Sequence, residues 1–549
     1  MTAPMRLTRE MIEENIARGH WNQKSITDIL EGNARSFPDH EAVVDSSHRY
    51  TWKTLNQAVN RVAVGLVKRG IHRDQALVAQ WPSTSDAVIL LLACQKAGIL
   101  SCFSPMTFRR KELKHLLQTL NASTVATPVT YRNTPYHDMA KEVAGDLPNL
   151  KHFIVLGDEG PEGTIPFGDL LKTPLSEEDP ETGLSKVAFS PFEVSVVVLS
   201  SGSTGMPKCI EHMGASCKVG GWGVVERGKL CREDVFGIIA PLSGGPGLQN
   251  WWGALQLGAK VCLLEHFSPE GALELIQTER VTYMPAIPTQ IIRILKEADI
   301  KRYDLSSLRI VRTGAAAFDT ALAREAEERM KCIVLIAGGS QETYSFAQTG
   351  VDDPPEKRVM TLGKPFPGNE VKICDDRGRP LPQGEIGHLH VRGASTSTGY
   401  FGDREATLAA WGKLGPEGWY STGDLARLDE EGYLVIVGRQ KEIIIRGGQN
   451  IYPKEIEDLL MTHPKVMQAV VIGLPDPVMG ERAWACVTAV EGEVFAFEEM
   501  TAFLKDKGLA LHKLPERLEA MERFPQLVDG QKVNRIALKE MLTERIKEP

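Results

Sequence analysis

Blocks of apolar and polar residues alternate along the first four-fifths of the chain. Residues 194–199 (Val-Ser-Val-Val-Val-Leu) form a short run rich in β-branched residues, which predicts a buried strand. Segments with helical spacing, such as 321–331, separate runs of this kind. The alternation predicts an α/β fold with largely parallel, doubly wound sheets. The other predicted strands lie at 76–81, 259–265, 308–314 and 332–339.

The pattern changes twice in the last third of the chain. From about residue 368, turn residues and period-two alternation predict a small antiparallel, β-barrel-like region. Near 437–450, charged residues and two adjacent glycines interrupt the pattern, and a helix starting at Pro453, strands and a further helix follow. We therefore expect a large N-terminal domain, residues 1–438, and a small α+β C-terminal domain, residues 439–549.

Composition narrows the class of protein. The 549 residues are 42% apolar, which is enough for large cores and more than one domain. The net charge of -8 argues against a nucleic-acid partner, and no stretch approaches eighteen uninterrupted apolar residues, so no membrane span is expected. Nine cysteines without C-x-x-C pairs and a charged N-terminus fit a cytoplasmic protein with reduced thiols.

One loop has the composition of a phosphate-binding segment. Residues 199–208 read LSSGSTGMPK and follow the predicted strand 194–199 directly. Hydroxyl groups and backbone N–H groups can contact phosphates, and glycines let the backbone approach them closely. Pro207 before Lys208 departs from the usual phosphate loop, in which glycine precedes lysine. An ordinary Ser/Gly surface turn is the alternative. The candidate residues are Ser200, Ser201, Gly202, Ser203, Thr204, Gly205 and Lys208.

Four further stretches follow in a fixed order. They read GGSQETYS (338–345), WYSTGD within 419–441, IIIRGGQNIYPKEIE (443–457) and FPQLVDGQKVNR (524–535). Together with the loop, they resemble the motifs of the adenylate-forming superfamily, which contains acyl-CoA synthetases, aryl-acid adenylating enzymes and luciferases. The resemblance extends over nearly the whole chain.

The resemblance implies a binding site for ATP and Mg²⁺. Glu342 matches the glutamate that binds magnesium, Asp424 the aspartate that accepts the ribose hydroxyls, and Arg439 its partner. Two positions depart from the family pattern, because Gly338 replaces an aromatic residue and Gln341 replaces threonine. Besides the loop, the implied ATP-binding residues are Gly314, Ala315, Ala316, Gly338, Gly339, Ser340, Gln341, Asp424 and Arg439.

The resemblance also implies catalytic roles for Lys532, Thr204, Glu342 and His212. Lys532 matches the lysine that reaches both the carboxylate and the α-phosphate, although Gln531 separates it from Gly530, where the family has an adjacent pair. His212 lies where many family members carry histidine, and a structural hydrogen bond is the alternative role for it.

The C-terminal domain is expected to be a mobile lid. Lys441 matches the hinge about which this domain rotates between two half-reactions. Gly447 and Gly448 match the segment at which the pantetheine thiol of coenzyme A approaches the adenylate.

The acid is expected to bind near residues 240–255. Gly244, Gly245 and Gly247 lie in this segment, and the first two stand where bulky polar residues often occur in the family. Small residues here predict a roomy, mainly apolar pocket for an aromatic, alicyclic or medium-chain acid.

The sequence thus predicts an AMP-forming acyl-CoA synthetase that uses ATP, Mg²⁺ and coenzyme A to activate a small carboxylic acid. One alternative is an adenylating enzyme that loads a carrier-protein phosphopantetheine. Another is a catalytically silent nucleotide-binding homologue, because the residues near Gly338 and Lys532 depart from the family pattern. Homodimers are common in the family.

Overall fold

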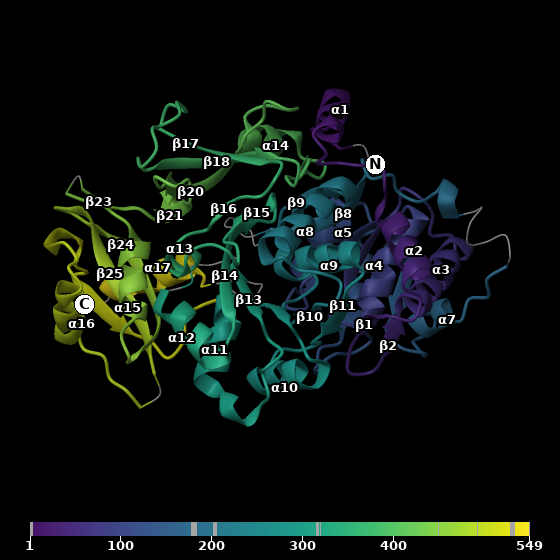
Figure 1. Ribbon diagram of the computed structural model, residues 1–549, viewed down its shortest axis with the longest axis horizontal. Helices are drawn as coiled ribbons and strands as arrows, with labels where there is room; N and C mark the ends of the chain where they lie inside the picture. The colour runs from purple at the N-terminus through teal and green to yellow at the C-terminus, as the bar shows by residue number, and fades with distance from the viewer. Residues whose placement is uncertain are drawn as a thin grey trace.

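The computed structural model describes residues 4–176, 184–200, 206–314, 318, 320–447, 449–490, 492–526 and 533–547. Within these ranges the N-terminal part contains two large sheets and a smaller third one, and the C-terminal part contains a fourth. Figure 1 shows the C-terminal part in yellow, beside the N-terminal sheets.

The first large sheet is built around parallel strands. The chain positions 308–314 and 332–339 form its neighbouring strands β13 and β14, as the apolar pattern predicts. Antiparallel strands close both edges. Its order among the described residues is β16 (Lys364–Pro365), β15 (Tyr344–Gln348), β14 (Ile333–Ser340), β13 (Ile310–Gly314), β12 (Tyr283–Pro285), β10 (Val235–Ile238), β11 (Lys260–Leu263), β1 (Glu41–Val44) and β2 (Arg49–Thr51).

The second large sheet carries the candidate phosphate loop. This loop connects β8 to β9, which is antiparallel to it, whereas the strands on the other side of β8 run parallel. The order is β19 (Gly399–Tyr400), β9 (Cys209–Met213), β8 (Val194–Leu199), β4 (Leu100–Ser104), β3 (Ala76–Gln80), β5 (Thr124–Thr127), β6 (His152–Val155) and β7 (Ile165–Pro166).

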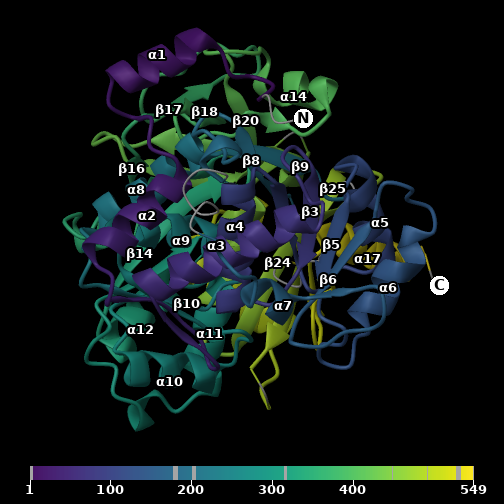
Figure 2. The same ribbon diagram turned by 90° about the vertical axis from the view of Figure 1, so that its right-hand side faces the viewer.

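Helices cover the faces of both sheets, so the predicted doubly wound α/β architecture is confirmed (Figure 2). One group packs between the sheets: α2 (Ile26–Ser36), α3 (Trp52–Lys68), α4 (Ser85–Ala97), α8 (Gly214–Gly228) and α9 (Gly245–Leu257). Helices α5 (Arg110–Thr119) and α6 (Tyr136–Ala144) cover the outer face of the second sheet. Helices α10 (Pro269–Glu279), α11 (Pro288–Glu297), α12 (Thr320–Met330) and α13 (Pro355–Met360) cover the outer face of the first sheet. The shorter helices α1 (Arg9–Ala17), α7 (Phe167–Leu171) and α14 (Arg404–Trp411) lie at the periphery.

The region expected to be barrel-like is an open antiparallel sheet. Its order is β17 (Asn369–Cys374), β18 (Gly387–Gly393), β20 (Tyr420–Leu428) and β21 (Leu434–Arg439). The two edge strands do not pair with each other. Leu434 in β21 instead exchanges backbone hydrogen bonds with Leu362 and Gly363, next to β16. The edge that could close a barrel is therefore joined to the first large sheet.

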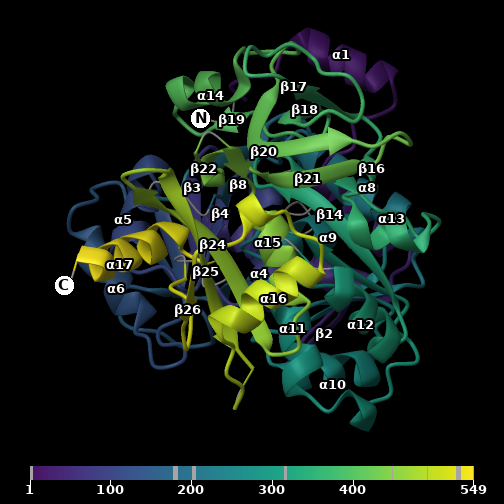
Figure 3. The ribbon, with the colours of Figure 1, turned by 90° about the vertical axis from the view of Figure 1, so that its left-hand side faces the viewer.

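The C-terminal domain has a sheet and cores of its own. Its strands are β22 (Ile444–Arg446), β23 (Gln449–Ile451), β24 (Val466–Asp476), β25 (Gly480–Ala489) and β26 (Arg517–Ala520). Helices α15 (Pro453–Met461) and α16 (Phe497–Asp506) pack on one face, and α17 (Arg535–Lys547) packs on the other. Figure 3 shows this domain in front, below β20 and β21. The predicted small α+β unit is confirmed.

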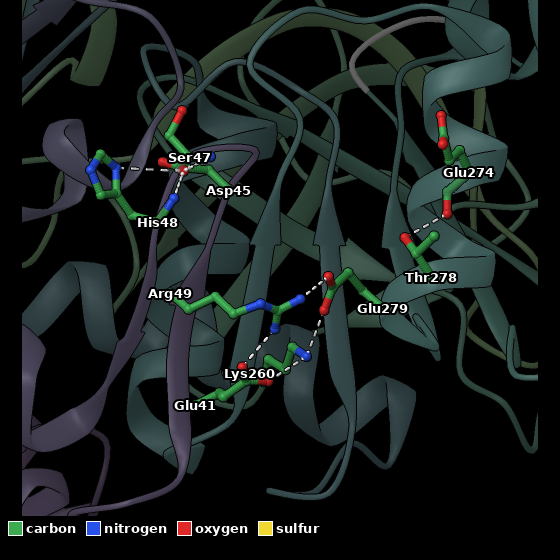
Figure 4. A network of polar contacts seen from close by, with 9 residues as sticks. All are labelled: Glu41, Asp45, Ser47, His48, Arg49, Lys260, Glu274, Thr278 and Glu279. Carbon is green, nitrogen blue, oxygen red and sulfur yellow. Dashed lines mark hydrogen bonds and ion pairs between the residues drawn. The ribbon is translucent and has the colours of Figure 1, made fainter.

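Charged residues protect the exposed edge of the first sheet. Arg49 on edge strand β2 forms ion pairs with Glu41 and with Glu279, and Lys260 also pairs with both carboxylates (Figure 4). The four side chains alternate in sign. A charged edge strand resists pairing with another chain.

The cysteines and the helices bear on two expectations drawn from the composition. All nine cysteines lie in the described ranges and are free, and Cys231 alone is exposed. Burial raises the pKa of the other eight thiols. None of the helices described here is both long enough and apolar enough to cross a membrane.

Glycines let α8 and α9 approach each other closely. A Cβ atom on Gly221 would lie 2.6 Å from the Gly253 nitrogen and 2.7 Å from the Trp252 carbonyl carbon. Backbone atoms cannot move aside cheaply, so residue 221 must be glycine.

We expect Gly221→Ala to destabilise the N-terminal domain by about 1–3 kcal/mol, because it overpacks this contact. Gly32 in α2 is the matched control, since a Cβ atom there would have no neighbour within 4 Å. Gly32→Ala should raise stability by about 0.5–1 kcal/mol. The shift of the urea unfolding midpoint measures both. Equal shifts in the two variants would contradict the packing argument.

Candidate functional site

A large cleft of about 3010 Å³ lies between the N-terminal sheets and the C-terminal domain, and both parts of the chain line it. Strands of both large sheets end at the cleft, as expected for ligand sites in α/β folds. Most of the described candidate residues line it: Ser200, Lys208, Gly244, Gly245, Gly314, Gly338, Gly339, Ser340, Gln341, Glu342, Asp424, Arg439 and Lys441.

Part of the candidate site lies outside the described residues, namely Ser201, Gly202, Ser203, Thr204, Gly205, Ala315, Ala316, Gly448 and Lys532. The neck of the phosphate loop is described. Ser200 donates its N–H to the Lys208 carbonyl at 3.1 Å, and Lys208 donates its N–H to the Ser200 hydroxyl at 3.2 Å. These two hydrogen bonds join the strand that precedes the loop to the residue that follows it, and both residues line the cleft.

The turn between β14 and β15 presents Glu342 to the cleft. A side chain at Gly339 would collide with the backbone of Tyr344 and Ser345 across the turn. Tyr344 adopts a φ of 50°, which is unusual for a residue other than glycine. The reversal is therefore tight, and it fixes the direction of the three residues between the strands.

Two tyrosines hold the Glu342 carboxylate. Tyr400 in β19 donates its hydroxyl to Glu342 Oε1 at 3.0 Å, and Tyr420 in β20 also hydrogen-bonds this carboxylate. Ser397 donates its N–H to the Glu342 carbonyl at 2.7 Å. Burial, followed by the charge of Glu342, raises the pKa of both tyrosines, so both remain hydrogen-bond donors. Sequence reasoning missed Tyr400, because nothing local distinguishes it from a core aromatic residue.

The N-terminal arm supports this cluster from behind. The buried guanidinium of Arg6 lies 4.8 Å from the centre of the Trp411 ring and donates to the Ser397 carbonyl at 3.0 Å. Trp411 in turn packs against Tyr400 and Tyr420. Residues close to the N-terminus thus contact the side chains that orient Glu342.

His212 does not line the cleft. It is fully buried behind the β14–β15 turn, and its Nε2 lies 2.8 Å from the Gln341 carbonyl, which can only accept a hydrogen bond. Burial lowers the pKa of His212 to about 4, so the ring is neutral at neutral pH and carries its proton on Nε2. His212 thus makes the kind of structural hydrogen bond that was the alternative role for it.

Asp424 and Arg439 face each other across β20 and β21. They are direct cross-strand neighbours, and Arg439 Nε donates to Asp424 Oδ1 at 3.0 Å. Burial raises the pKa of Asp424, and the Arg439 charge opposes that effect. The Thr422 side chain also hydrogen-bonds this carboxylate and, like Arg439, opposes the effect of burial on its pKa.

The glycines of the expected acyl pocket differ in their surroundings. A Cβ atom on Gly244 would make ordinary van der Waals contact with the Pro241 carbonyl oxygen at 3.7 Å, so a small side chain would fit there without a collision. At Gly245 the equivalent position is 3.0 Å from Gln341 Oε1, so Gln341 occupies that space. Gly247 packs against the backbone of Pro241 and does not line the cleft, which corrects its assignment to the pocket.

Gly338 is covered by a side chain from another segment. A Cβ atom there would collide with Leu362 Cδ1. The aromatic residue that the family usually carries at this position would therefore require Leu362 to move.

One wall of the cleft is polar, which differs from the expected mainly apolar pocket. Arg312 in β13 lines the cleft and is only 4% exposed. Its Nε donates to Gln348 Oε1 at 2.7 Å, and its Nη2 donates to the Ser345 hydroxyl and, at 3.5 Å, to Gln249 Oε1. An arginine within an otherwise apolar strand was the signal available in the sequence, because charged residues are rarely fully buried.

Ion pairs of Arg535 in α17 join the segment after Lys441 to helix α15. Arg535 donates from Nη2 to both Glu457 carboxylate oxygens, at 2.7 and 2.8 Å, and its Nε lies 3.5 Å from Glu442. Glu442 immediately follows the exposed Lys441. Gly447 has a φ of 56° in the β22–β23 turn and does not line the cleft.

Glu342 also meets the requirements of a magnesium ligand. Among the described residues, no group of three or more His, Cys, Asp or Glu side chains could hold a metal ion. A single carboxylate fits Mg²⁺, which usually takes one or two carboxylates and completes its shell with water and substrate phosphates.

Comparison with known proteins gives consistent matches over the length of the chain. The AMP-binding enzyme family matches residues 30–401, and the AMP-binding enzyme C-terminal domain matches residues 455–530. The 2,3-dihydroxybenzoate-AMP ligase of Bacillus subtilis (strain 168) is 32% identical, with 98% of this chain and 97% of that protein covered. The medium-chain fatty-acid–CoA ligase of Escherichia coli (strain K12) is 30% identical, with 96% and 92% covered.

A solved structure shows the same fold. The crystal structure of the anthranilate CoA ligase AuaEII in complex with anthranoyl-AMP has a TM-score of 0.85 at 23% identity, covering 96% of this chain and 98% of that one. With two family domains in order and relatives matched over almost their full length, the chain belongs to the AMP-binding enzymes, the adenylate-forming superfamily of acyl-CoA and aryl-acid ligases.

Proposed function

We propose that the protein is an ATP- and magnesium-dependent carboxylic acid–CoA ligase that works through an acyl-adenylate. The observation that supports this most is the convergence of three groups on one cleft: the neck of the phosphate loop, the Glu342 carboxylate and the Asp424–Arg439 pair.

The first half-reaction needs no protein nucleophile. The substrate carboxylate attacks the α-phosphate of ATP, a C(O)O–P bond forms, and pyrophosphate leaves. The protein must neutralise the triphosphate and align the carboxylate. In this proposal the loop from Ser200 to Gly205 and Lys208 hold the leaving phosphates, Glu342 holds Mg²⁺, and Asp424 Oδ2 accepts from the ribose. Lys532 stabilises charge between the carboxylate and the α-phosphate.

The second half-reaction uses the C-terminal domain as a mobile lid. Residues 439–549 rotate about Lys441, and Gly448 then lies beside the thiol of coenzyme A, which attacks the acyl carbonyl and releases AMP. The Glu442–Arg535–Glu457 contacts support this proposal, because they fix the hinge to both α15 and α17. The domain would move as one body.

The substrate is an aromatic, alicyclic or medium-chain acid. The glycine at position 244 in the cleft lining supports this class, and so does the match to a medium-chain fatty-acid–CoA ligase. The match to a 2,3-dihydroxybenzoate-AMP ligase favours a second candidate, an adenylating enzyme that passes its acyl group to a carrier protein.

Glu342→Gln and Asp424→Asn should each slow adenylation by roughly 100- to 1,000-fold, because each removes a contact to the charged nucleotide or its metal. Acid-dependent exchange between pyrophosphate and ATP, measured across an acid panel, tests this and the proposed function together. Glu405 is the control, since it also lines the cleft but lies exposed at its rim. Near-normal exchange in Asp424→Asn would exclude the ribose contact, and no exchange with any acid in the unaltered protein would indicate a silent homologue.

Free coenzyme A should consume the adenylate and release AMP, whereas a holo carrier protein should not. The measurement is AMP release after one round of adenylation, with each thiol supplied at equal concentration. A faster reaction with the carrier protein would favour the second candidate.

His212 is proposed as a positioning residue for the Gln341–Glu342 turn, and its burial predicts a pH dependence. Its folded-state pKa of about 4 lies below the ordinary 6.5, so the unfolded chain binds the proton more readily between these values. The contribution of His212 to the free energy of unfolding is therefore complete above pH 6.5. It falls by about 1.4 kcal/mol per pH unit as the pH is lowered towards 4.

His212→Gln keeps an N–H donor for the Gln341 carbonyl but cannot titrate, so its urea midpoint should fall less between pH 7.5 and pH 5 than that of the unaltered protein. The exposed His72 is the control, because it contacts water in both states. If His72→Gln and His212→Gln show the same acid dependence, the buried neutral histidine is not its source.

A further inference from the structure

Arg312 is a buried cation with only neutral partners. The three groups that accept its hydrogen bonds are the side-chain oxygens of Gln348, Ser345 and Gln249. Its Nη1 has no hydrogen-bond partner among the residues described by the structure. Burial lowers the pKa of the guanidinium, and Tyr283 is the one titratable neighbour that opposes this effect.

A charge in this position is costly to the folded protein. Burying an ion is unfavourable unless an opposite charge and hydrogen bonds compensate for it. Elsewhere in the described chain, the half-buried Arg535 donates to both carboxylate oxygens of the buried Glu457. Arg312 lacks such a carboxylate, although it lies in the wall of the cleft. An anionic group entering the cleft would supply the missing charge.

The position of Arg312 relates it to the acid. It precedes Gly314 by two residues in β13, so the two Cα atoms are about 6.6 Å apart along an extended strand. Gly314 lies at the end of this strand and lines the same cleft as Gly244, beside which the proposed function places the acid. Gln249 and Ser345, which also line the cleft, come from α9 and β15 and lie on the same side as Arg312.

We propose that Arg312 binds a second carboxylate of the substrate. The enzyme would then activate one carboxylate of a dicarboxylic acid while the polar wall of the cleft holds the other. The inference rests on the proposed function and narrows its substrate class. The two carboxylates would be joined by a ring or a short chain that passes Gly244. Ser345 and Gln249 orient the guanidinium and add polar contacts to the distal group.

Matched pairs of acids test this proposal: adipate against hexanoate, and cyclohexane-1,4-dicarboxylate against cyclohexanecarboxylate. Acid-dependent pyrophosphate release gives kcat/KM for each. In the unaltered protein the diacid should exceed its partner by roughly 10- to 100-fold, as expected for a charged hydrogen bond. Arg312→Met should abolish or reverse this ratio, and Arg312→Lys should keep part of it, because the charge remains but the forked geometry is lost.

Arg309→Met is the matched control. Arg309 is on the same segment but is half-exposed and pairs with Asp234 outside the cleft, so the ratio should not change. If Arg312→Met lowers kcat/KM by the same factor for all acids, the role of Arg312 is structural and the proposal is overturned. Equal rates with 6-hydroxyhexanoate and adipate would overturn the requirement for an anion.

The same measurements distinguish a failure of the Arg312 assignment from a failure of the proposed ligase function. If the monoacids drive pyrophosphate release as well as the diacids do, the assignment of Arg312 is wrong and the ligase function stands. If no acid of either kind drives it, the proposed function itself is wrong.

Discussion

The tight reversal between β14 and β15 is the constraint on which the site depends. The backbones at Gly339 and Tyr344 lie so close together that the path of the residues between them is fixed. Around this turn, Tyr400 comes from the second large sheet, Tyr420 from the open sheet, and His212 from β9. The position of Glu342 is therefore set jointly by all the N-terminal sheets, and it is defined only once they have assembled.

Two polar side chains in this region, His212 and Arg312, are buried in different ways. His212 is buried as a neutral ring with a satisfied donor, which stabilises the turn at neutral pH. Arg312 is buried with a charge that its neutral partners do not balance. Natural proteins commonly break a local rule of stability at functional positions. By that criterion the histidine belongs to the scaffold and the arginine to the ligand site.

Contiguous features were predictable from the sequence, and long-range ones were not. Strand β8 and its loop are one segment with a clear apolar-to-small transition, so both could be placed. The same holds for the helix starting at Pro453. The contact of Tyr400 with Glu342 joins residues 58 positions apart, and that of Arg6 with Ser397 joins residues 391 apart. Strand β21 likewise pairs with a distant residue, Leu362, instead of closing a barrel. Periodicity reports which face of an element is apolar but not which distant residue meets it.

The native cysteines differ in exposure, so they can be labelled selectively with thiol reagents. Cys231 is exposed in the folded protein, whereas the other eight thiols are shielded in the interior. A maleimide dye can therefore be attached at a single native position, without engineered cysteines. The shielded thiols react only when their surroundings open, and one of them, Cys486, lies in the C-terminal sheet while Cys209 adjoins the phosphate loop. Pulsed alkylation followed by peptide mass analysis can thus follow the opening of the two halves of the molecule separately, within one unmodified chain.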